Sequence, residues 1–495
     1  DDAAVIRGRT PELGKFRIRI VPAQTNQHPE VPKNLRSIGG IDTNGVKIRG
    51  VGLAVPKTEV WKAKDIFQDV LLDSAQKRAR AIAKHTKDYG KMPGSLLFGL
   101  DNAGLRKKSK NLLFTQMVVH GEFAFDVVYE CADTTSHIDG EVIDAIASNR
   151  RKEFDARFEA AFNLREKGFS DGQTEMARNA LSSLIGGIGY FYGSGLVSSA
   201  PKPEYGTADE DSEARLGEPY SLFATTPSRP FFPRGFLWDE GFHQLVLRRW
   251  DPDLSLEIIR SWFATMDDSG WIPREQILGD EARSKVPREF QVQYPNFANP
   301  PTILFAVEAM AERLLARGMS VRPVDDMLLQ VAGGGGALEV EGTCDERCLL
   351  QTKLNSLVPF TSKLLEFFQN TQAGDTRGEG ARSGAAGYRW RGRTENHTLT
   401  SGLDDYPRAQ TPSTGELHVD LYSWVTYMMR LNSELSSTDD SGELESHLAM
   451  LDKLHWNEQE NMYCDVTVST RDDYDELEED EEAAMERVFV CHRGY

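Results

Sequence analysis

Aromatic, acidic and basic residues alternate within residues 231–301 in a pattern that suits recognition of a sugar. The segment begins FFPRGFLWDEGFHQL and later reads GWIPREQILGDEARSK. Several of its residues are types that an ordinary aliphatic core would not contain: Trp238, Asp239, Glu240, His243, Trp271, Arg274 and Glu275. Pyranose rings have apolar faces that stack on aromatic rings, and hydroxyl edges that form charge-assisted hydrogen bonds. The segment therefore predicts a carbohydrate site, while Arg274 and Glu275 taken alone are also typical of a structural salt bridge.

A glycosidase needs two carboxyl groups, one that protonates the leaving oxygen and one that activates water or attacks carbon. The strongest candidates for the first role are Asp404 and Asp405, in the loop SGLDDYPR at residues 401–408. Adjacent side chains in such a loop point in different directions, so one carboxylate can face a cleft while the other stabilises the loop. A helix-capping turn explains the same residues without catalysis.

Two segments around this loop carry further candidates. Glu416 and Asp420 are four residues apart and are predicted to share one face of a helix, which Trp424 continues. The segment YRWRGR at residues 388–393 places Trp390 among three arginines, a pattern typical of a sugar site or of a cation–π cluster. Each motif alone is weak evidence, and their occurrence in one chain is what favours a site.

Composition narrows the class of protein. A chain of 495 residues, 40% of them hydrophobic and 27% charged, can bury a large core and is expected to form two domains. The net charge of −19 argues against nucleic acid as a partner, because phosphate binding needs a basic surface. No run of about 18 apolar residues occurs, and Asn396-His397-Thr398 is a weak N-glycosylation signal.

The cysteines are too sparse and irregular for a disulfide framework or a zinc site, and neither a metal nor a cofactor is expected. They are Cys131, Cys344, Cys348, Cys464 and Cys491. Cys344 and Cys348 either pair with each other or remain free thiols. The acidic run at residues 472–482 and the Gly-rich stretches at 333–336 and 373–387 are predicted to be surface loops without a chemical role.

Strand periodicity dominates the first part of the chain. Apolar residues and arginines alternate in FRIRI at residues 16–20, as in a half-buried strand. Residues 112–119 and 123–129 predict the two strands of a hairpin, and residues 61–89 predict an inserted helical segment. We therefore expect residues 1–135 to form a partial β-sandwich.

Helical periodicity replaces strand periodicity from residue 136 onward. Phe154, Phe158 and Phe162 predict a linker helix within residues 136–170. Apolar stripes predict further helices, including one that Asp251 caps ahead of Pro252. The stripes lie at residues 176–188, 238–246, 254–262, 303–315, 357–368, 420–431 and 444–454. Successive antiparallel helix pairs favour an α/α toroid over residues 171–495, so the expected fold class is mainly α with an N-terminal β-domain.

Several motifs in a fixed order resemble glycoside hydrolase family 63. They are FFPRGFLWDEGFHQL, GWIPREQILGDEARSKV, YRWRGR, SGLDDYPRA and GELHVDLYSW. The similarity runs from Leu13 to the last residue, and the longest motifs are highly specific. It implies a β-sandwich followed by an (α/α)6 barrel. It also implies an inverting α-glucosidase that removes the terminal α-1,2-linked glucose from the triglucosylated N-glycan precursor on nascent glycoproteins.

The resemblance further implies a cellular location and a role for each matching residue. The family works in the lumen of the endoplasmic reticulum without a cofactor, and a membrane anchor is expected upstream of this sequence. Asp404 matches the general acid. The residues that match the family's glucose pocket are Phe236, Trp238, Asp239, Arg274, Glu275 and Trp390, and its substrate-binding segment is matched by Glu416, His418, Asp420 and Trp424.

This sequence departs from the family pattern in two respects. Leu417, Tyr422 and Ser423 replace two arginines and a cysteine of the usual segment ERHxDLRCW, which bears on glycan specificity more than on reaction type. The family's catalytic base is a glutamate in a later segment, so we expect a fragment that lacks the base, the last barrel helices and the first sandwich strands. Two alternatives stay open: a related inverting α-glycosidase acting on a small glycoside, and a glycan-binding pseudoenzyme.

Overall fold

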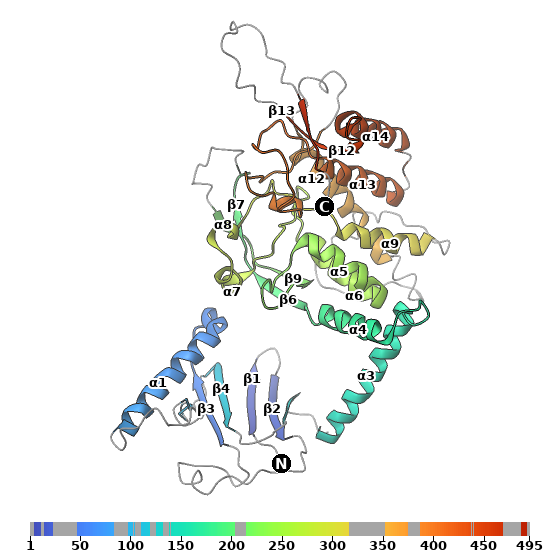
Figure 1. The fold of residues 1–495 in the computed structure, drawn as a ribbon. Helices are drawn as coiled ribbons and strands as arrows, with labels where there is room; N and C mark the ends of the chain where they lie inside the picture. The colour runs from blue at the N-terminus through green and yellow to red at the C-terminus, as the bar shows by residue number, and fades with distance from the viewer. Residues whose placement is uncertain are drawn as a thin grey trace, which may run out of the picture. The chain divides into compact units, whose positions relative to one another are not determined.

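The chain divides into two compact units, Asp1–Ala156 and Arg157–Tyr495. The computed structural model describes residues 4–10, 14–22, 47–83, 98–101, 103, 110–118, 125–131, 138, 140–202, 214–315, 352–374, 387–436, 438, 440–468 and 487–492. About half of the described part is helical and its sheets are few and small, which is compatible with the expected mainly α class (Figure 1). The boundaries predicted for the domains stay predictions.

Two antiparallel sheets form the first unit, one in the order β1-β2-β5 and the other of β3 and β4. The strands are β1 (Ala4–Thr10), β2 (Gly14–Pro22), β3 (Lys47–Leu53), β4 (Leu112–Val118) and β5 (Phe125–Cys131). A short 3-10 helix, η2 (Lys57–Lys62), leads into α1 (Ala63–Ala83), which confirms the inserted helix. The predicted hairpin is wrong, because β4 pairs with β3 and β5 pairs with β2 along their whole lengths. Strands distant in sequence therefore decide the pairing.

The arginines of β2 are less exposed than a solvated strand face would be. Arg19 is only 7% exposed, and its guanidinium donates to Glu130 of β5 at 3.1 and 3.0 Å. Arg17 bonds to the same carboxylate at 2.5 Å. Hydrogen bonding to Arg19, with further help from Arg17, lowers the pKa of Glu130 to about 2. The strand itself is confirmed, and ion pairing explains why its charged residues are buried.

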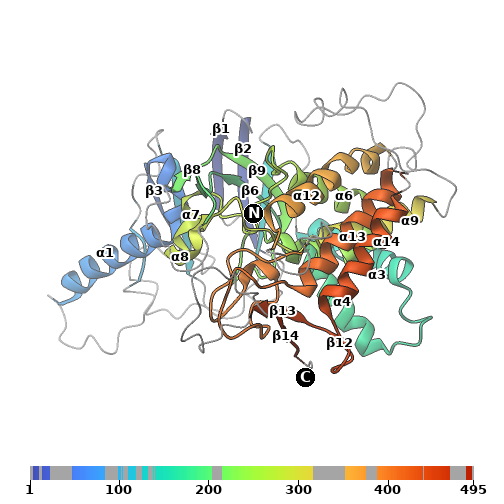
Figure 2. The ribbon, with the colours of Figure 1, turned by 90° about the horizontal axis from the view of Figure 1, so that it is seen from above.

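The boundary between the units falls within α3 (Gly140–Phe162), which contains the three phenylalanines of the predicted linker helix. The other helices are α4 (Asp171–Ile185), α5 (Leu237–Trp250), α6 (Pro252–Phe263), α7 (Gly279–Ser284), α8 (Arg288–Gln291), α9 (Ile303–Leu315), α12 (Val358–Thr371), η4 (Leu399–Ser401), α13 (Val419–Ser436) and α14 (Ser441–His455). In the second unit α5 packs against α6 and α9, and α13 packs against α12 and α14. Figure 2 shows α13 and α14 running side by side.

Short strands accompany these helices. They are β6 (Ile188–Gly193), β7 (Leu196–Ser198), β8 (Ala214–Leu216), β9 (Tyr220–Thr225), β10 (Val292–Gln293), β11 (Trp456–Asn457), β12 (Met462–Tyr463), β13 (Asp465–Val468) and β14 (Arg487–Val490). β6 pairs with β9, β11 with β12 and β13 with β14, and β7 lies between β10 and β8. The β6–β9 ladder ends at Thr225, whose backbone N–H donates to Glu240 of α5 at 2.9 Å.

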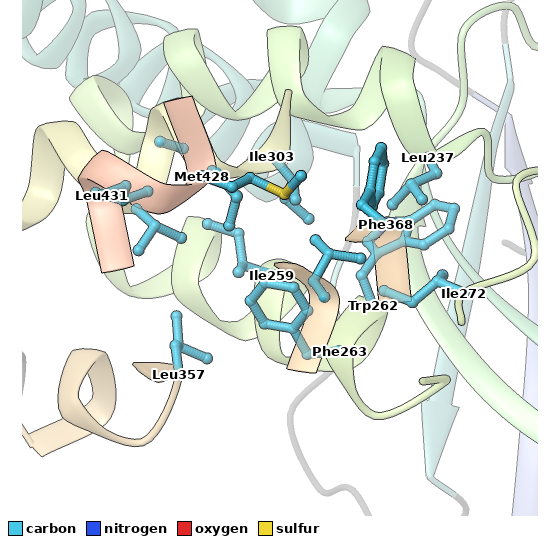
Figure 3. Packing of buried hydrophobic residues seen from close by; sticks show 14 of the residues in the cluster. Leu237, Ile259, Trp262, Phe263, Ile272, Ile303, Leu357, Phe368, Met428 and Leu431 are labelled. Atoms are coloured by element: carbon cyan, nitrogen blue, oxygen red, sulfur yellow. The ribbon is translucent and has the colours of Figure 1, made fainter. Parts of the chain in front are cut away.

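One apolar core joins the helices of the second unit (Figure 3). Trp262 and Phe263 of α6, Phe368 of α12 and Met428 of α13 are each at most 1% exposed. Burying a large apolar side chain of this kind contributes about 1.5–3 kcal/mol to stability. The core therefore holds in place the helices that position the polar residues of the candidate site.

The start of α6 follows the predicted capping. The Asp251 side chain accepts the backbone N–H of Leu254 at 3.0 Å, and Pro252 is the first residue of α6, as predicted. The stripe predicted over residues 176–188 is wrong in part, because α4 ends at Ile185 and Met176 is 74% exposed. Leu181 is buried as the stripe predicts, Leu184 and Ile185 pack against the core, and Thr174 is a buried polar residue outside the stripe.

The buried face of α5 is not the apolar stripe that the sequence suggests. Phe242 and Val246 of that stripe are exposed, whereas Glu240 and Gln244 have no exposed surface. Gly241 lies on the buried face too, because a Cβ atom there would come within 2.1 Å of Thr302. Burial of polar groups is tolerated where hydrogen bonds replace the lost water, and α5 meets this condition.

Cys464 and Cys491 form a disulfide that joins the ends of β13 and β14, which the cysteine spacing did not predict. Cys344, Cys348, the acidic run at 472–482, the glycines at 333–336 and most of the stretch 373–387 lie outside the described residues. Across the ranges that the structure does describe, no helix has the length and apolar character of a membrane span. The same ranges contain no group of His, Cys, Asp and Glu side chains that could hold a metal ion.

Candidate active site

Trp238 lies in the first turn of α5, against the loop that carries Asp404. Gly402 has a left-handed backbone with φ of 72°, and a Cβ atom at this position would lie only 2.7 Å from the indole of Trp238. The ring therefore packs directly on the backbone of Gly402. Glycine alone combines this conformation with so close an approach. The structure thus places the LWDE and SGLDDYPR motifs in contact.

The loop of Asp404 is held by its own polar groups. The backbone N–H of Thr398 donates to the carbonyl of Asp404 at 3.0 Å. The Ser401 hydroxyl donates to the carbonyl of Thr398 at 2.8 Å and accepts the N–H of Leu403 at 3.1 Å. Thr398 and Ser401 are buried, whereas Asp404 is exposed. The buried, hydrogen-bonded residues therefore hold the loop in place, and Asp404 is exposed to solvent.

A buried amide connects this loop to α5. Asn299 accepts the backbone N–H of Trp238 at 2.9 Å and donates to the carbonyl of Thr400 at 3.0 Å. Thr302, three residues later, donates its hydroxyl to the carbonyl of Trp238 at 2.5 Å. No local pattern marks Asn299, because both of its partners are distant in the sequence.

Arg274 lies close enough to Asp239 and Asp404 to affect the pKa of both carboxyl groups. The pKa of Asp239 is raised to about 6, chiefly by burial and in smaller part by the charge of Asp404, while Arg274 opposes the shift. Although Asp404 is exposed as a residue, partial desolvation of its carboxyl group raises its pKa, again against the effect of Arg274. In the part of the chain that the structure describes, the half-buried Arg274 guanidinium has neither a hydrogen-bond nor an ion-pair partner. It is therefore available to donate to a ligand.

Glu275 occupies a different environment from its neighbour Arg274. It is 4% exposed, and the guanidinium of Arg234 lies 2.5 Å from its carboxylate. Phe236 and Glu275 face each other in an isolated β-bridge, and the N–H of Leu237 donates to the carbonyl of Arg274 at 2.9 Å. This pairing places Phe236 and Arg274 beside the start of α5. The geometry gives Glu275 a structural ion pair, and its assignment as a sugar contact stays a prediction.

Glu240 joins α5 to Thr225 of β9 and to Trp262 of α6. Its carboxylate accepts from the N–H of Thr225 at 2.9 Å, from Gln244 Nε2 at 2.6 Å and from Trp262 Nε1 at 2.8 Å, and also from the Thr225 hydroxyl. That hydroxyl donates to Glu240, so it accepts from Nδ1 of His243, 3.0 Å away. Burial raises the pKa of Glu240 to about 7 and lowers that of His243 to about 4. Glu240 therefore supports the turn that carries Trp238 and Asp239.

A second buried group surrounds His418. Glu416 and His418 are each 1% exposed, and Glu416 pairs with Arg393 at 2.8 Å. His418 Nδ1 accepts the N–H of Trp390 at 3.0 Å, so Nε2 carries the proton that His418 shares with Glu416, also at 3.0 Å. Burial, followed by the charges of nearby arginines, holds the pKa of His418 well below its usual value. His418 is therefore a neutral structural link.

The predicted helical face of Glu416 and Asp420 is wrong. The helix α13 begins only at Val419, because Leu417 pairs with Val466 of β13 and the N–H of His418 donates to the carbonyl of Tyr388. These backbone bonds keep the segment before the helix extended. Glu416 and Asp420 consequently reach different partners.

Asp420 belongs to an ion-pair network centred on Arg408. The Arg408 guanidinium bonds to Asp420 at 2.8 and 3.2 Å and to Asp465 at 2.7 Å. Burial alone would lower the pKa of Arg408, but the two carboxylates together raise it. Asp465 also accepts the N–H of Val419 at 2.8 Å, which caps α13. Neither Arg408 nor Asp465 was identified from the sequence, since nothing local marks a carboxylate that acts across 57 residues.

Trp390 is completely buried. It has no exposed surface, its indole N–H donates to Asp420 at 2.9 Å and its ring meets Phe368 edge to face. A ring without an exposed face cannot stack on a sugar in this arrangement, and the match of Trp390 to the family's glucose pocket stays a prediction. Trp424 packs on Phe305 of α9 and on Tyr427. The candidate site thus consists of Trp238, Asp239, Arg274 and Asp404, with Phe236 beside it and the His418 and Arg408 groups as support.

Comparisons with known proteins agree with the motif order. Residues 138–495 match the family described as "Glycosyl hydrolase family 63 C-terminal domain", and residues 1–96 match its N-terminal domain. The chain is 35% identical to the "Probable mannosyl-oligosaccharide glucosidase" of Schizosaccharomyces pombe, over 99% of this chain and 61% of that protein. It is 34% identical to the "Mannosyl-oligosaccharide glucosidase" of Saccharomyces cerevisiae, over 99% of this chain and 60% of that protein. The chain therefore spans about three fifths of the length of these relatives.

Proposed function

Because the chain belongs to glycosyl hydrolase family 63, we propose that it carries the glucose pocket of an inverting α-glucosidase. The substrate would be the triglucosylated N-glycan precursor, from which the enzyme removes the terminal α-1,2-linked glucose. The grouping of Trp238, Asp239, Arg274 and Asp404 carries this proposal. The names of the yeast relatives, which refer to a mannosyl-oligosaccharide, support the substrate class.

Asp404 acts in this proposal as the general acid. A general acid must be protonated when the leaving oxygen departs, and partial desolvation raises the pKa of Asp404 in that direction. Its exposure allows a glycosidic oxygen to approach the carboxyl group. In an inverting reaction a second carboxylate activates water on the opposite face of the sugar, about 6.5–9.5 Å away. We assign no described residue to that role.

Trp238 and the two charged residues would bind the glucose ring. Trp238 is half-buried, and its contact with Gly402 fixes the orientation of the indole before a ligand arrives. Arg274 can donate to sugar hydroxyls because it lacks a partner among the described residues, and Asp239 can accept from them. Stacking plus charge-assisted hydrogen bonds is the combination expected for a pyranose.

The same proposal includes the architecture and the compartment. The paired helices of the second unit would belong to an (α/α)6 barrel, and α5–α6 and α13–α14 are the pairs that support it. The enzyme would act in the lumen of the endoplasmic reticulum. The disulfide between Cys464 and Cys491 supports an oxidising compartment.

The test is Asp404→Asn in the complete protein, with Asp405→Asn as the matched control. An amide cannot supply the proton, so we expect kcat for glucose release from the triglucosylated glycan to fall by about 10²–10⁴-fold. Asp405→Asn should keep most of the activity. Near-normal turnover by Asp404→Asn would refute the assignment, and release of α-glucose instead of β-glucose by the wild type would refute inversion.

Two further assays separate the alternatives. Faster hydrolysis of small α-glucosides than of the glycan would favour the related glycosidase. Glycan binding without any glucose release by the complete wild-type protein would favour the pseudoenzyme.

A further inference from the structure

The side chain of Asn299 spans the two halves of the candidate site. Its Oδ1 atom accepts from the backbone of Trp238, the residue before Asp239, at 2.9 Å. Its Nδ2 atom donates to the backbone carbonyl of Thr400, in η4 directly before the Asp404 loop, at 3.0 Å. Asn299 is only 5% exposed, so both bonds form largely away from water. Bonds of this kind are worth more where water cannot compete for the same groups.

The chemistry of the two partners fixes the orientation of the amide. A backbone N–H can only donate and a carbonyl oxygen can only accept, so the oxygen of Asn299 must face Trp238 and its nitrogen must face Thr400. An aspartate could serve only the first partner, and an alanine neither. The position therefore requires a short side chain that accepts at one end and donates at the other.

Movement of either partner would be transmitted to the acids. The hydrogen bonds among Thr398, Ser401, Leu403 and the carbonyl of Asp404 make the loop a unit, so a shift at Thr400 carries Asp404 with it. On the other side, Trp238 also receives the Thr302 hydroxyl on its carbonyl. The backbone N–H and the carbonyl of Trp238, in the first turn of α5, are therefore both bonded to side chains of the segment 299–302.

We infer that Asn299 is a positioning residue that sets the separation between Asp239 and Asp404 by joining the start of α5 to the Asp404 loop. This inference rests on the proposed function, because it assigns Asp404 as the acid. In this role Asn299 acts through its bonds to the backbone of Trp238 and Thr400, which determine where the acid lies relative to the groups that bind the sugar. Displacement of a reacting group by about 1 Å typically costs about 10²-fold in rate.

The test compares Asn299→Ala with Asn296→Ala in the complete protein. Asn296 is a matched control because its side chain also bridges a backbone N–H and a carbonyl, both of Lys202, at 3.0 and 3.1 Å. Neither of these partners belongs to the site. We expect Asn299→Ala to lower kcat by about 10–100-fold with KM changed by less than about 3-fold. Asn296→Ala should keep kcat within about 2-fold of the wild type.

A pH profile separates positioning from a purely structural role. Releasing the loop should leave Asp404 better solvated, so the pH above which kcat falls should move to lower values in Asn299→Ala. A merely structural residue would lower stability and the yield of folded protein, but it would leave kcat per folded molecule and the pH profile unchanged. That second result would overturn the inference.

If Asn299→Ala does not fold, Asn299→Asp is the second variant, because it keeps an acceptor for the N–H of Trp238 and removes the donor to the carbonyl of Thr400. A fall in kcat together with the shift of the pH profile expected for Asn299→Ala would support positioning by Asn299, whereas wild-type kcat and an unchanged profile would overturn it. An inactive wild type would instead count against the proposed function, so the two failures can be distinguished.

Discussion

Replacing Gly402 by alanine tests whether the contact between the loop and Trp238 holds Asp404 in place. A φ of 72° costs an L-residue about 1–2 kcal/mol. The added Cβ would lie 2.7–3.0 Å from three indole atoms, whereas carbon atoms normally meet at about 3.5–4.0 Å. Overpacking of this kind costs about 1–3 kcal/mol. We therefore expect the free energy of unfolding of the second unit to fall by about 2–5 kcal/mol.

Activity should fall as well, because relief of the overlap requires the ring or the loop to move by about 1 Å. A shift of this size corresponds to a loss of about 10²-fold in kcat/KM. Glucose release from the triglucosylated glycan measures kcat/KM, and urea unfolding followed by tryptophan fluorescence measures the free energy of unfolding. The matched control is Gly442→Ala in α14, where no atom lies within 4 Å of the new Cβ. That variant should keep full activity and an equal or slightly higher stability.

Two outcomes would refute this reasoning. Unchanged stability and activity in Gly402→Ala would show that the loop tolerates a side chain at this position and that Trp238 is not held by it. A large loss of stability with full kcat would show that the contact maintains the fold without positioning Asp404.

Burial places the folded-state pKa of Glu240 at about 7, above its ordinary value of 4.5, so its contribution to stability is complete below pH 4.5 and is lost as the pH rises through 7. The loss amounts to about 3 kcal/mol, and Glu240→Gln, which cannot titrate, should flatten the change in urea-unfolding free energy between pH 4.5 and 7.5. Trp238→Ala should weaken binding of a glucose-like inhibitor about 2–10-fold, measured by calorimetry, and unchanged affinity would return the ring to a structural role. Trp390→Ala should instead lower the free energy of unfolding by about 3–5 kcal/mol, because it empties a fully buried position.

Elements with a strong local signal could be predicted from the sequence. The helix predicted over residues 303–315 coincides with α9, and the Asp251 cap of α6 is present. The family is confirmed by the matches that cover most of the chain. Periodicity, capping chemistry and motifs are properties of short segments, so a single sequence is sufficient to predict these features.

Features that depend on distant partners could not be predicted. The buried face of α5 depends on Glu240 meeting Thr225 and Trp262, and the strand pairing of the first unit depends on β2 and β3 rather than on the nearest strand. A helical-wheel reading treats a glutamate as an exposed residue, because it has no information about donors elsewhere in the chain. The same limit concealed the bridging role of Asn299.

The long sequence separations within the candidate site have a consequence for how the protein folds. The bonds of Asn299 join residues 61 and 101 positions apart, and the residues near Asp404 pack against a helix that begins much earlier in the chain. Contacts between distant segments form late, because the entropy of closing long loops must be overcome before those contacts stabilise anything. During synthesis the turn of α5 therefore emerges well before its partners. The candidate site should be among the last parts of the second unit to form, so a nascent or partly folded chain would have helices before the candidate site is assembled.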